Sequence, residues 1–244
     1  MNRLQGKTAV ITGGASGIGL GTARRFVEEG AFVYLFGRRQ GQLDDAVAEL
    51  GPPARAVQGS VTDLADLDRL YETVKAERGG LDILLANAGT GSFAPLGELT
   101  PEQYDQTFDV NVKGVIFTVQ KALPLMGPGG SIILTGSTTG VMGTPEFSIY
   151  SASKAAVRNL ARTWALDLKG TGIRVNVLSP GPTTTKLARE VLGDEGLAAM
   201  GASTVLGRMG DPAETGAVAA FLASSDSSFM TGGEVFVDGG LAQV

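Results

Sequence analysis

Near the N-terminus of this 244-residue chain stands the stretch Thr8-Ala9-Val10-Ile11-Thr12-Gly13-Gly14-Ala15-Ser16-Gly17-Ile18-Gly19. Its first four residues predict a short strand, and the glycines after them predict a turn into a helix running through Thr22 to Glu29. Glycines let the backbone approach a pyrophosphate, and the N-terminus of the next helix offers free N–H groups and a positive dipole end. The spacing is GxxxGxG and not the GxGxxG of the common dinucleotide fingerprint. The stretch therefore predicts a strand–turn–helix unit that binds phosphate.

The rest of the chain repeats this strand–helix order. We expect strands at residues 32–36, 54–58, 83–86, 131–135, 174–178 and 234–237, and helices at 42–50, 64–78, 101–121, 150–168 and 212–223. Regular alternation with apolar strands predicts an α/β fold: a Rossmann-type, doubly wound parallel sheet of about seven strands with helices on both faces. No linker, repeat or low-complexity tract divides the chain, so we predict a single domain over residues 1–244.

Two of the predicted helices, at 101–121 and 150–168, are apolar over more than one face. A helix that lies on a sheet needs only one apolar stripe. The surplus predicts a second buried surface, which we interpret as an interface between subunits of a homo-oligomer. Complete burial of these helices inside one subunit is the alternative.

Composition narrows the function classes. The chain has no His and no Cys, which excludes disulfides, thiol nucleophiles and the usual zinc and iron sites. We predict no metal, with a carboxylate site for a hard cation as the alternative. A net charge of −5 without a cluster of Lys and Arg argues against nucleic acid as a partner. Residues 1–7 lack an apolar signal core and no apolar run approaches the length of a membrane span, so we expect a cytoplasmic protein without a membrane partner.

Without His or Cys, proton transfer near neutral pH has to use a carboxylate, a tyrosine or a lysine with a shifted pKa. Tyr150 stands four residues before Lys154, which on a helix places their Cβ atoms about 5–6 Å apart. The Tyr150 phenol would need its pKa lowered by about 3 units, and one ammonium seldom supplies that alone. A cationic cofactor ring and a second hydrogen-bond donor would have to contribute. A pair of surface neighbours is the simpler interpretation of this spacing.

The end of the second predicted strand bears on the choice of cofactor. In dinucleotide sites an acidic residue here accepts from the ribose 2′-OH, whereas an Arg suits a 2′-phosphate. Gly37 occupies the acidic position and Arg38 follows it. This favours NADP(H) over NAD(H), although Arg38 is also explained as a solvated surface charge.

With these features together, the chain resembles the short-chain dehydrogenase/reductases over nearly its whole length, as a ketoreductase-like member. The motif TGxxxGxG of that family matches residues 12–19, its NAG matches residues 87–89, and its YxxxK matches residues 150–154. Asn111 falls at the helix asparagine of the family, Ser137 lies thirteen residues before Tyr150 as the catalytic serine does, and its PG motif matches residues 180–181 with Thr185 following.

The resemblance implies a nicotinamide-dependent oxidoreductase in which Tyr150 protonates a ketone oxygen while hydride reaches the carbonyl carbon, or the reverse. It implies that Ser137 stabilises the developing alkoxide, that Lys154 supports the tyrosinate and holds ribose hydroxyls, and that Asn111 holds a water. Asn111 as a satisfied core amide is the alternative. The cofactor residues implied are Gly13, Ser16, Gly17, Ile18, Gly19, Arg38, Asn87, Ala88, Gly89, Tyr150, Lys154, Pro180, Gly181, Thr183 and Thr185. A family tetramer is implied as well.

Two positions depart from the family pattern. Many members carry Asp before the Val at the end of the third strand, where it contacts adenine, whereas this chain has Ser60 before Val61. Ser60 still offers a hydrogen bond, with weaker adenine recognition expected. Ala86 replaces the first Asn of an NNAG motif, which is a milder change.

Residues 182–209 lack strand patterning and mix apolar with polar residues, which is typical of a mobile lid and matches the substrate loop of the family. The predicted pocket residues are Phe93, Val141, Met142, Phe147 and Leu187. They favour a small, largely apolar ketone or its secondary alcohol, as for a carbonyl reductase or alcohol dehydrogenase. A 3-oxoacyl-carrier-protein reductase ranks second. Docking of an acidic carrier needs basic residues near the mouth of the site, where we expect residues 123–130, and this stretch supplies none. Sugar or polyol dehydrogenases rank third, and a non-enzymatic nucleotide sensor is the alternative from another class.

Overall fold

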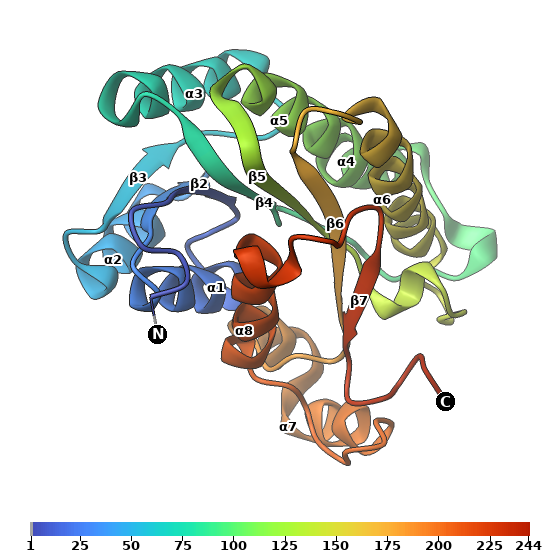
Figure 1. Cartoon of the computed structure of the whole chain (residues 1–244). Coiled ribbons are helices and arrows are strands. Elements are labelled where there is room, and N and C mark those ends of the chain that lie inside the picture. Colours follow the sequence, from blue (N-terminus) through green and yellow to red (C-terminus); the bar gives the residue numbers. More distant parts are fainter. Residues whose placement is uncertain (1) are drawn as a thin grey trace.

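Seven parallel strands form one sheet in the order β3-β2-β1-β4-β5-β6-β7 (Figure 1). The computed structural model describes residues 2–244, apart from the side chains of residues 187, 191 and 192. The strands are β1 (Thr8–Thr12), β2 (Phe32–Gly37), β3 (Ala54–Gln58), β4 (Leu81–Ala86), β5 (Met126–Thr135), β6 (Arg174–Pro180) and β7 (Glu234–Val237). The strand order reverses direction between β1 and β4. The predicted doubly wound parallel sheet of about seven strands is confirmed.

Helices cover both faces of the sheet (Figure 1). One face packs against α3, α5 and α6, and the other against α1, α2 and α8, so each face has its own apolar core. The helix bounds are α1 (Gly17–Glu28), α2 (Gln40–Leu50), α3 (Leu64–Arg78), α4 (Pro101–Phe108), α5 (Gly114–Ala122), α6 (Ser148–Asp167), α7 (Lys186–Ala202) and α8 (Pro212–Ala223). The central strands β1 and β2 are buried over nearly their whole length, which explains why their sequences are almost continuous apolar runs.

Two helical features differ from the sequence expectation. The predicted helix 101–121 is interrupted by a wider π turn at Asp109–Lys113, which separates α4 from α5. Residues 182–209 contain α7, which we did not predict because its apolar residues follow no regular spacing and Gly193 interrupts it with a φ of 65°. The ends of that segment are tied together, since Thr184 N–H donates to the Gly210 carbonyl and Gly210 N–H to the Pro182 carbonyl, both at 2.8 Å.

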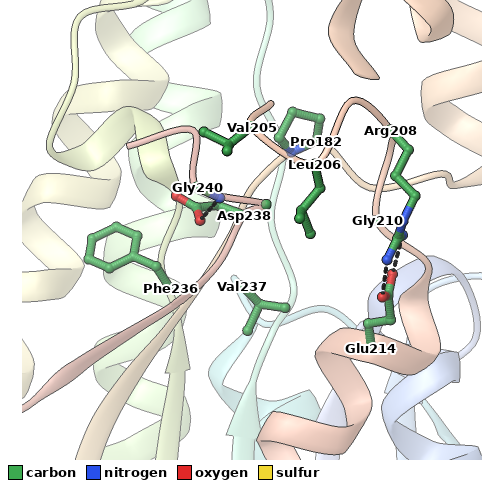
Figure 2. Close-up of a pocket in the computed structure, with 11 residues that line it drawn as sticks. Pro182, Val205, Leu206, Arg208, Gly210, Glu214, Phe236, Val237, Asp238 and Gly240 are labelled. Carbon is green, nitrogen blue, oxygen red and sulfur yellow. Dashed lines mark hydrogen bonds and ion pairs between the residues drawn. The ribbon is translucent and has the colours of Figure 1, made fainter. Parts of the chain in front are cut away.

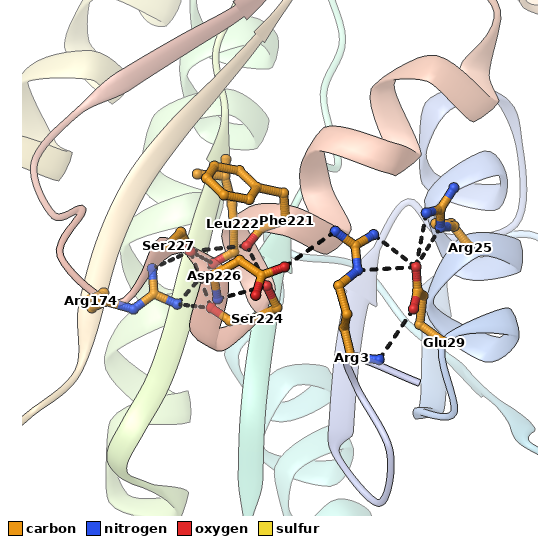
Figure 3. A network of polar contacts seen from close by, with 9 residues as sticks. All are labelled: Arg3, Arg25, Glu29, Arg174, Phe221, Leu222, Ser224, Asp226 and Ser227. Atoms are coloured by element: carbon orange, nitrogen blue, oxygen red, sulfur yellow. Dashed lines mark hydrogen bonds and ion pairs between the residues drawn. The ribbon is translucent and has the colours of Figure 1, made fainter. Parts of the chain in front are cut away.

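A buried carboxylate ties the N-terminus to the end of α1 (Figure 3). Glu29 is 2 % exposed and accepts from the Arg3 guanidinium at 2.7 Å and from Arg25, one turn earlier, at 2.8 Å. Arg3 also pairs with Asp226 at 3.6 Å, which joins this cluster to the segment after α8. The hydrogen bonds from Arg3, with those from Arg25, lower the pKa of Glu29 to about 2 against the desolvation that opposes them.

Glu29→Gln is expected to lower the free energy of unfolding by about 1–3 kcal/mol at pH 7. The folded pKa of Glu29 lies below its ordinary value of 4.5, so its stabilisation is complete above pH 4.5 and is lost as the pH falls toward 2. Urea unfolding at pH 7 and at pH 2.5 would measure the loss, which should shrink at the lower pH. Glu28→Gln, at the exposed neighbouring position, is the matched control and should change little. An equal loss at both pH values would contradict the prediction.

Candidate active site

The strand order of the sheet gathers the predicted site residues at one edge. The glycine turn follows β1, Asn87 follows β4, Ser137 follows β5, and Pro180 ends β6. These four strands are neighbours and run parallel, so their carboxyl ends meet. The strand order reverses between the carboxyl ends of β1 and β4. Open α/β sheets bind ligands in the crevice at such a point, so we refer to this region as the crevice between β1 and β4.

The glycine turn has the geometry of a cradle for a diphosphate. Gly13 and Gly17 have positive φ angles of 65° and 52°, which disfavour any residue with a Cβ. A Cβ on Gly19 would overlap the Gly13 carbonyl oxygen and lie 2.8 Å from Asn87 Nδ2. Ser16 is the N-cap of α1 and Ile18 lies in its first turn, so free N–H groups of this helix open into the crevice. The residues present therefore fit a dinucleotide pyrophosphate.

Thr12 and Asn87 hold the turn against the end of β4. The Thr12 hydroxyl accepts from the backbone N–H groups of Asn87 and Ala88, both at 3.0 Å. The Asn87 amide donates to the Thr12 carbonyl at 3.1 Å and to the Gly13 carbonyl at 3.3 Å. Asn87 thus fixes the shape of the glycine turn. We did not assign Thr12 a role from the sequence, although it begins the TGxxxGxG motif.

Gly89, one of the predicted cofactor residues, lies beside two of the predicted catalytic residues. A Cβ on Gly89 would lie 3.4 Å from Asn111 Oδ1 and 3.6 Å from Lys154 Nζ. Lys154 is 4 % exposed, and its ammonium donates to the Thr135 carbonyl at the end of β5, at 2.8 Å. The crevice, Asn111 and Lys154 therefore adjoin one another.

Asn111 lies on the π turn and is completely buried. Its Oδ1 accepts from Thr90 N–H at 2.8 Å, and its Nδ2 donates to the Thr90 carbonyl at 2.8 Å and to Ser153 Oγ at 3.0 Å. Ser153 in turn donates to the Tyr150 carbonyl at 2.6 Å. Both amide hydrogens of Asn111 are used within the protein, and its role in holding a water stays a prediction. Ser153 and Thr90 are links that the sequence did not indicate.

Tyr150 and Ser137 lie together where α6 passes the end of β5. Burial raises the pKa of the Tyr150 phenol, and the contact with the Ser137 hydroxyl lowers it by less. Lys154 Nζ lies 5.5 Å from the centre of the Tyr150 ring, and burial lowers the pKa of this ammonium to about 8. Lys154 is thus mostly protonated at pH 7. Burial thus acts against an acidic phenol at Tyr150.

The remaining predicted cofactor residues surround the crevice. Arg38 is exposed after β2, and Ser60 and Val61 follow β3, where the Ser60 hydroxyl pairs with that of Thr62 at 2.8 Å. Gly181 packs against Asp238, and the Thr183 hydroxyl donates to the Gly181 carbonyl at 3.0 Å. Thr185 contacts the glycine turn, since a Cβ on Gly17 would lie 3.1 Å from its Cγ2. The segment after β6 therefore reaches back to the turn after β1.

The predicted pocket residues divide into two groups. Phe93 and Phe147 stack in a row with Tyr150. Val141 and Met142 follow the single turn Thr138–Gly140 that comes after Ser137, and Val141 is 42 % exposed. The side chain of Leu187 lies outside the described part of the chain.

A cavity of about 400 Å³ opens farther along the same edge of the sheet (Figure 2). Its apolar wall comes from the last part of the 182–209 segment and from β7, and Arg208 pairs with Glu214 at 2.7 Å across one side. The apolar lining is Pro182, Val205, Leu206, Phe236 and Val237. None of the four predicted catalytic residues lines it. The cavity is thus next to the PG motif but is separate from the crevice between β1 and β4.

Within residues 2–244 the acidic side chains form no group of three that could hold a metal ion. Of the helices described, none combines the length and the apolar character that crossing a membrane requires.

Comparison with known proteins places these features in a family. The family model described as "Enoyl-(Acyl carrier protein) reductase" matches residues 13–242. "Oxidoreductase asL5" of Sarocladium schorii is 65% identical over 246 residues, covering 100% of this chain and 99% of that protein. The "NADP-dependent (R)-specific alcohol dehydrogenase" of Lentilactobacillus kefiri is 36% identical, with 98% of both chains covered. A solved "short chain dehydrogenase/reductase family protein" is similar with a TM-score of 0.89 and 39% identity, covering 99% of this chain and 100% of its own.

Proposed function

Because the chain belongs to the short-chain dehydrogenase/reductase family and is an oxidoreductase, we propose that it interconverts a largely apolar ketone and its secondary alcohol with NADP(H). The observation that carries this proposal is the meeting of Ser137, Tyr150 and Lys154 beside the glycine cradle. Lys154 and Asn111 both adjoin Gly89, which belongs to the cofactor region.

The chain's own residues account for the proton side of the reaction. Tyr150 donates its phenolic proton to the carbonyl oxygen during reduction, and Ser137 donates a hydrogen bond that holds the same oxygen. Lys154 stays charged near pH 7 and stabilises the resulting tyrosinate through space. Asn111 and Ser153 fix the backbone of α6 at Tyr150. Together these groups hold one proton at Tyr150, which delivers it during reduction and accepts it back during oxidation.

The cofactor is assigned to the crevice on the fit of the residues there. The cradle at residues 13–19 and the N-terminus of α1 would hold the pyrophosphate, Arg38 the ribose 2′-phosphate, and Lys154 the hydroxyls of the nicotinamide ribose. When bound, the nicotinamide group supplies the hydride for reduction or accepts it for oxidation.

The structure removes one reason for ranking a 3-oxoacyl-carrier-protein reductase below a reductase of apolar ketones. Residues 123–130 begin β5, whereas Ser137 follows its carboxyl end, so this stretch lies at the opposite edge of the sheet from Tyr150. Our expectation that it lies near the mouth of the site is wrong. Its lack of basic residues therefore says nothing about docking of an acidic carrier, and 3-oxoacyl thioesters belong in the substrate test beside simple ketones.

The test is a spectrophotometric assay of NADPH and NADH oxidation with a panel of aryl ketones, β-keto esters, diketones, 3-oxoacyl thioesters and sugars. We expect turnover with apolar ketones and little with polyols in the reverse direction. Binding of NADPH without turnover of any carbonyl compound would refute the proposal and favour a nucleotide sensor.

Arg38→Ala is expected to raise the KM for NADPH at least about tenfold and to leave the KM for NADH within about twofold. The reason is that an exposed guanidinium after β2 contributes a charge-assisted hydrogen bond only where a 2′-phosphate is present. Steady-state kinetics with each cofactor measure both values. Arg39→Ala, at the next exposed position, is the matched control. A wild-type enzyme that prefers NADH would contradict the assignment of Arg38.

We also propose that two copies meet through the outer faces of α4, α5 and α6. Leu166 is 76 % exposed and Tyr104 49 % exposed, and Leu160 and Trp164 are only partly buried. This is more exposed apolar surface than a helix on a sheet needs.

Leu166→Asp is therefore expected to shift the sedimentation velocity toward a smaller species, because the new carboxylate would be desolvated in the interface. Leu96→Asp is the control, since Leu96 is 81 % exposed and lies outside these three helices. A wild-type protein that sediments as a monomer at micromolar concentration would refute this interface.

A further inference from the structure

Three aromatic rings form one continuous stack that ends at Tyr150. The ring of Phe147 lies 4.3 Å from that of Tyr150, centre to centre, with an angle of 22° between the planes. The ring of Phe93 lies 4.1 Å from that of Phe147 with an angle of 10°. Phe93 is 52 % exposed, so the stack begins in solvent and ends at the partly buried ring of Tyr150. Phe147 therefore packs against one face of the Tyr150 ring.

The loop that carries Phe93 also presses directly on Tyr150. A Cβ on Gly91 would lie 2.5 Å from Cδ2 of Tyr150 and 3.1 Å from its Cγ. A real Cβ essentially never comes so close to another heavy atom, so only glycine fits here without movement of the ring. The backbone at Gly91 thus lies close against the Cδ2 edge of the Tyr150 ring and limits movement of the ring in that direction.

Both ends of this loop are fixed. Thr90 is held by the two hydrogen bonds to the Asn111 amide. Ala94 N–H donates to the Glu146 carbonyl at 2.8 Å, which ties the loop to the turn that carries Phe147. Since each end is anchored, Gly91 and Phe93 keep their places against Tyr150 and Phe147.

Glu146 adopts the left-handed conformation with a φ of 59°, which is unusual for a residue with a side chain. It stands immediately before Phe147, so this conformation sets the direction in which the turn enters α6. Strained backbone of this kind persists where the surrounding contacts require it, and it gathers at functional sites. The contacts made around this residue are the hydrogen bond from Ala94 N–H to the Glu146 carbonyl and the stacking of Phe147 on Tyr150.

We propose that Phe147 and Gly91 are positioning residues for the reaction, which together hold the Tyr150 ring so that its hydroxyl stays beside Ser137. This inference rests on the proposed function. Proton transfer requires the phenol within hydrogen-bond reach of the carbonyl oxygen, and a displacement of about 1 Å can lower a rate about a hundredfold. The stack on one face and the glycine at the edge remove the torsional freedom that would allow such a displacement.

The experiment compares kcat, KM and NADPH affinity of Phe147→Leu, Phe147→Tyr and Gly91→Ala with the wild type. Phe147→Leu keeps an apolar side chain but loses the stack, and we expect kcat to fall at least tenfold while the KM for ketone and the Kd for NADPH stay within about threefold. Phe147→Tyr restores a ring and should return kcat to within about threefold of the wild type. Gly91→Ala should lower kcat at least tenfold in the same way, because its Cβ displaces the Tyr150 ring.

Two controls separate positioning from general stability. Gly97→Ala changes a glycine in the following turn where an added Cβ would meet no atom within 4 Å. Phe32→Leu removes a ring from the Phe32–Tyr34 pair at the amino end of β2, at the other edge of the sheet. Both should keep the wild-type kcat.

An unchanged kcat in Phe147→Leu and Gly91→Ala would overturn the inference. The inference would also be overturned if Phe147→Tyr lost as much kcat as Phe147→Leu. The same holds if the losses appeared in KM and NADPH affinity instead of kcat. If one variant does not fold, the other decides. A wild-type protein that reduces no carbonyl compound is a different result, because it refutes the proposed function itself.

Discussion

Tyr150→Phe is expected to lower kcat for ketone reduction by about two to four orders of magnitude while NADPH binds with nearly unchanged affinity. The substitution removes only the phenolic oxygen, so the ring remains stacked on Phe147 and the α6 backbone remains held by Ser153. No His or Cys exists elsewhere in the chain to replace the lost proton donor. General acid catalysis by a positioned side chain contributes a factor of this size. NADPH oxidation measures turnover, and NADPH fluorescence measures binding.

Tyr104→Phe is the matched control for this variant. Tyr104 is 49 % exposed on α4 and its ring stacks on Phe108, so loss of its hydroxyl leaves the crevice unchanged. Its kcat should equal that of the wild type. A Tyr150→Phe enzyme that retained more than a tenth of the wild-type kcat would show that another group delivers the proton.

Gly19→Ala is expected to weaken NADPH binding at least about a hundredfold. The added Cβ would overlap the Gly13 carbonyl oxygen and approach the Asn87 amide, so the turn would have to open. The same carbonyl and amide share the hydrogen bond that shapes the cradle. A pyrophosphate bound by backbone N–H groups tolerates little movement of those groups. Isothermal titration with NADPH measures the effect, and thermal unfolding without cofactor measures any loss of stability.

Gly41→Ala provides the matched control within a helix. Gly41 lies in α2, and a Cβ there would meet no atom within 4 Å. Ala is more favourable than Gly inside a helix by up to about 1 kcal/mol, so this variant should be as stable as the wild type or more so. It should bind NADPH normally. Equal affinity of Gly19→Ala and Gly41→Ala for NADPH would exclude the glycine turn as the pyrophosphate site.

The chemistry of Tyr150 shows what the spacing of residues along the sequence does not predict. The YxxxK pattern predicts that a lysine lies near the phenol, and Lys154 Nζ is indeed 5.5 Å from the ring centre. Spacing does not reveal how far each group is removed from solvent, and burial raises the pKa of Tyr150 and lowers that of Lys154. The acidity needed for catalysis therefore depends on charges added at this site, which no pattern of residues along one helix expresses.

The sequence by itself determined the strand–helix units, the parallel sheet and the edge at which the site lies. These follow from local rules: apolar periodicity selects each element, and parallel strands place the residues after them at one edge. Only the tertiary structure decided the π turn that seats Asn111, its bonds to Thr90 and Ser153, and the stack of Phe93 and Phe147 on Tyr150. The tertiary structure also places residues 123–130 at the opposite edge of the sheet from Tyr150. Phe93 and Phe147 are 54 positions apart, and contacts at that range depend on how two loops meet above adjacent strands, which local periodicity does not encode.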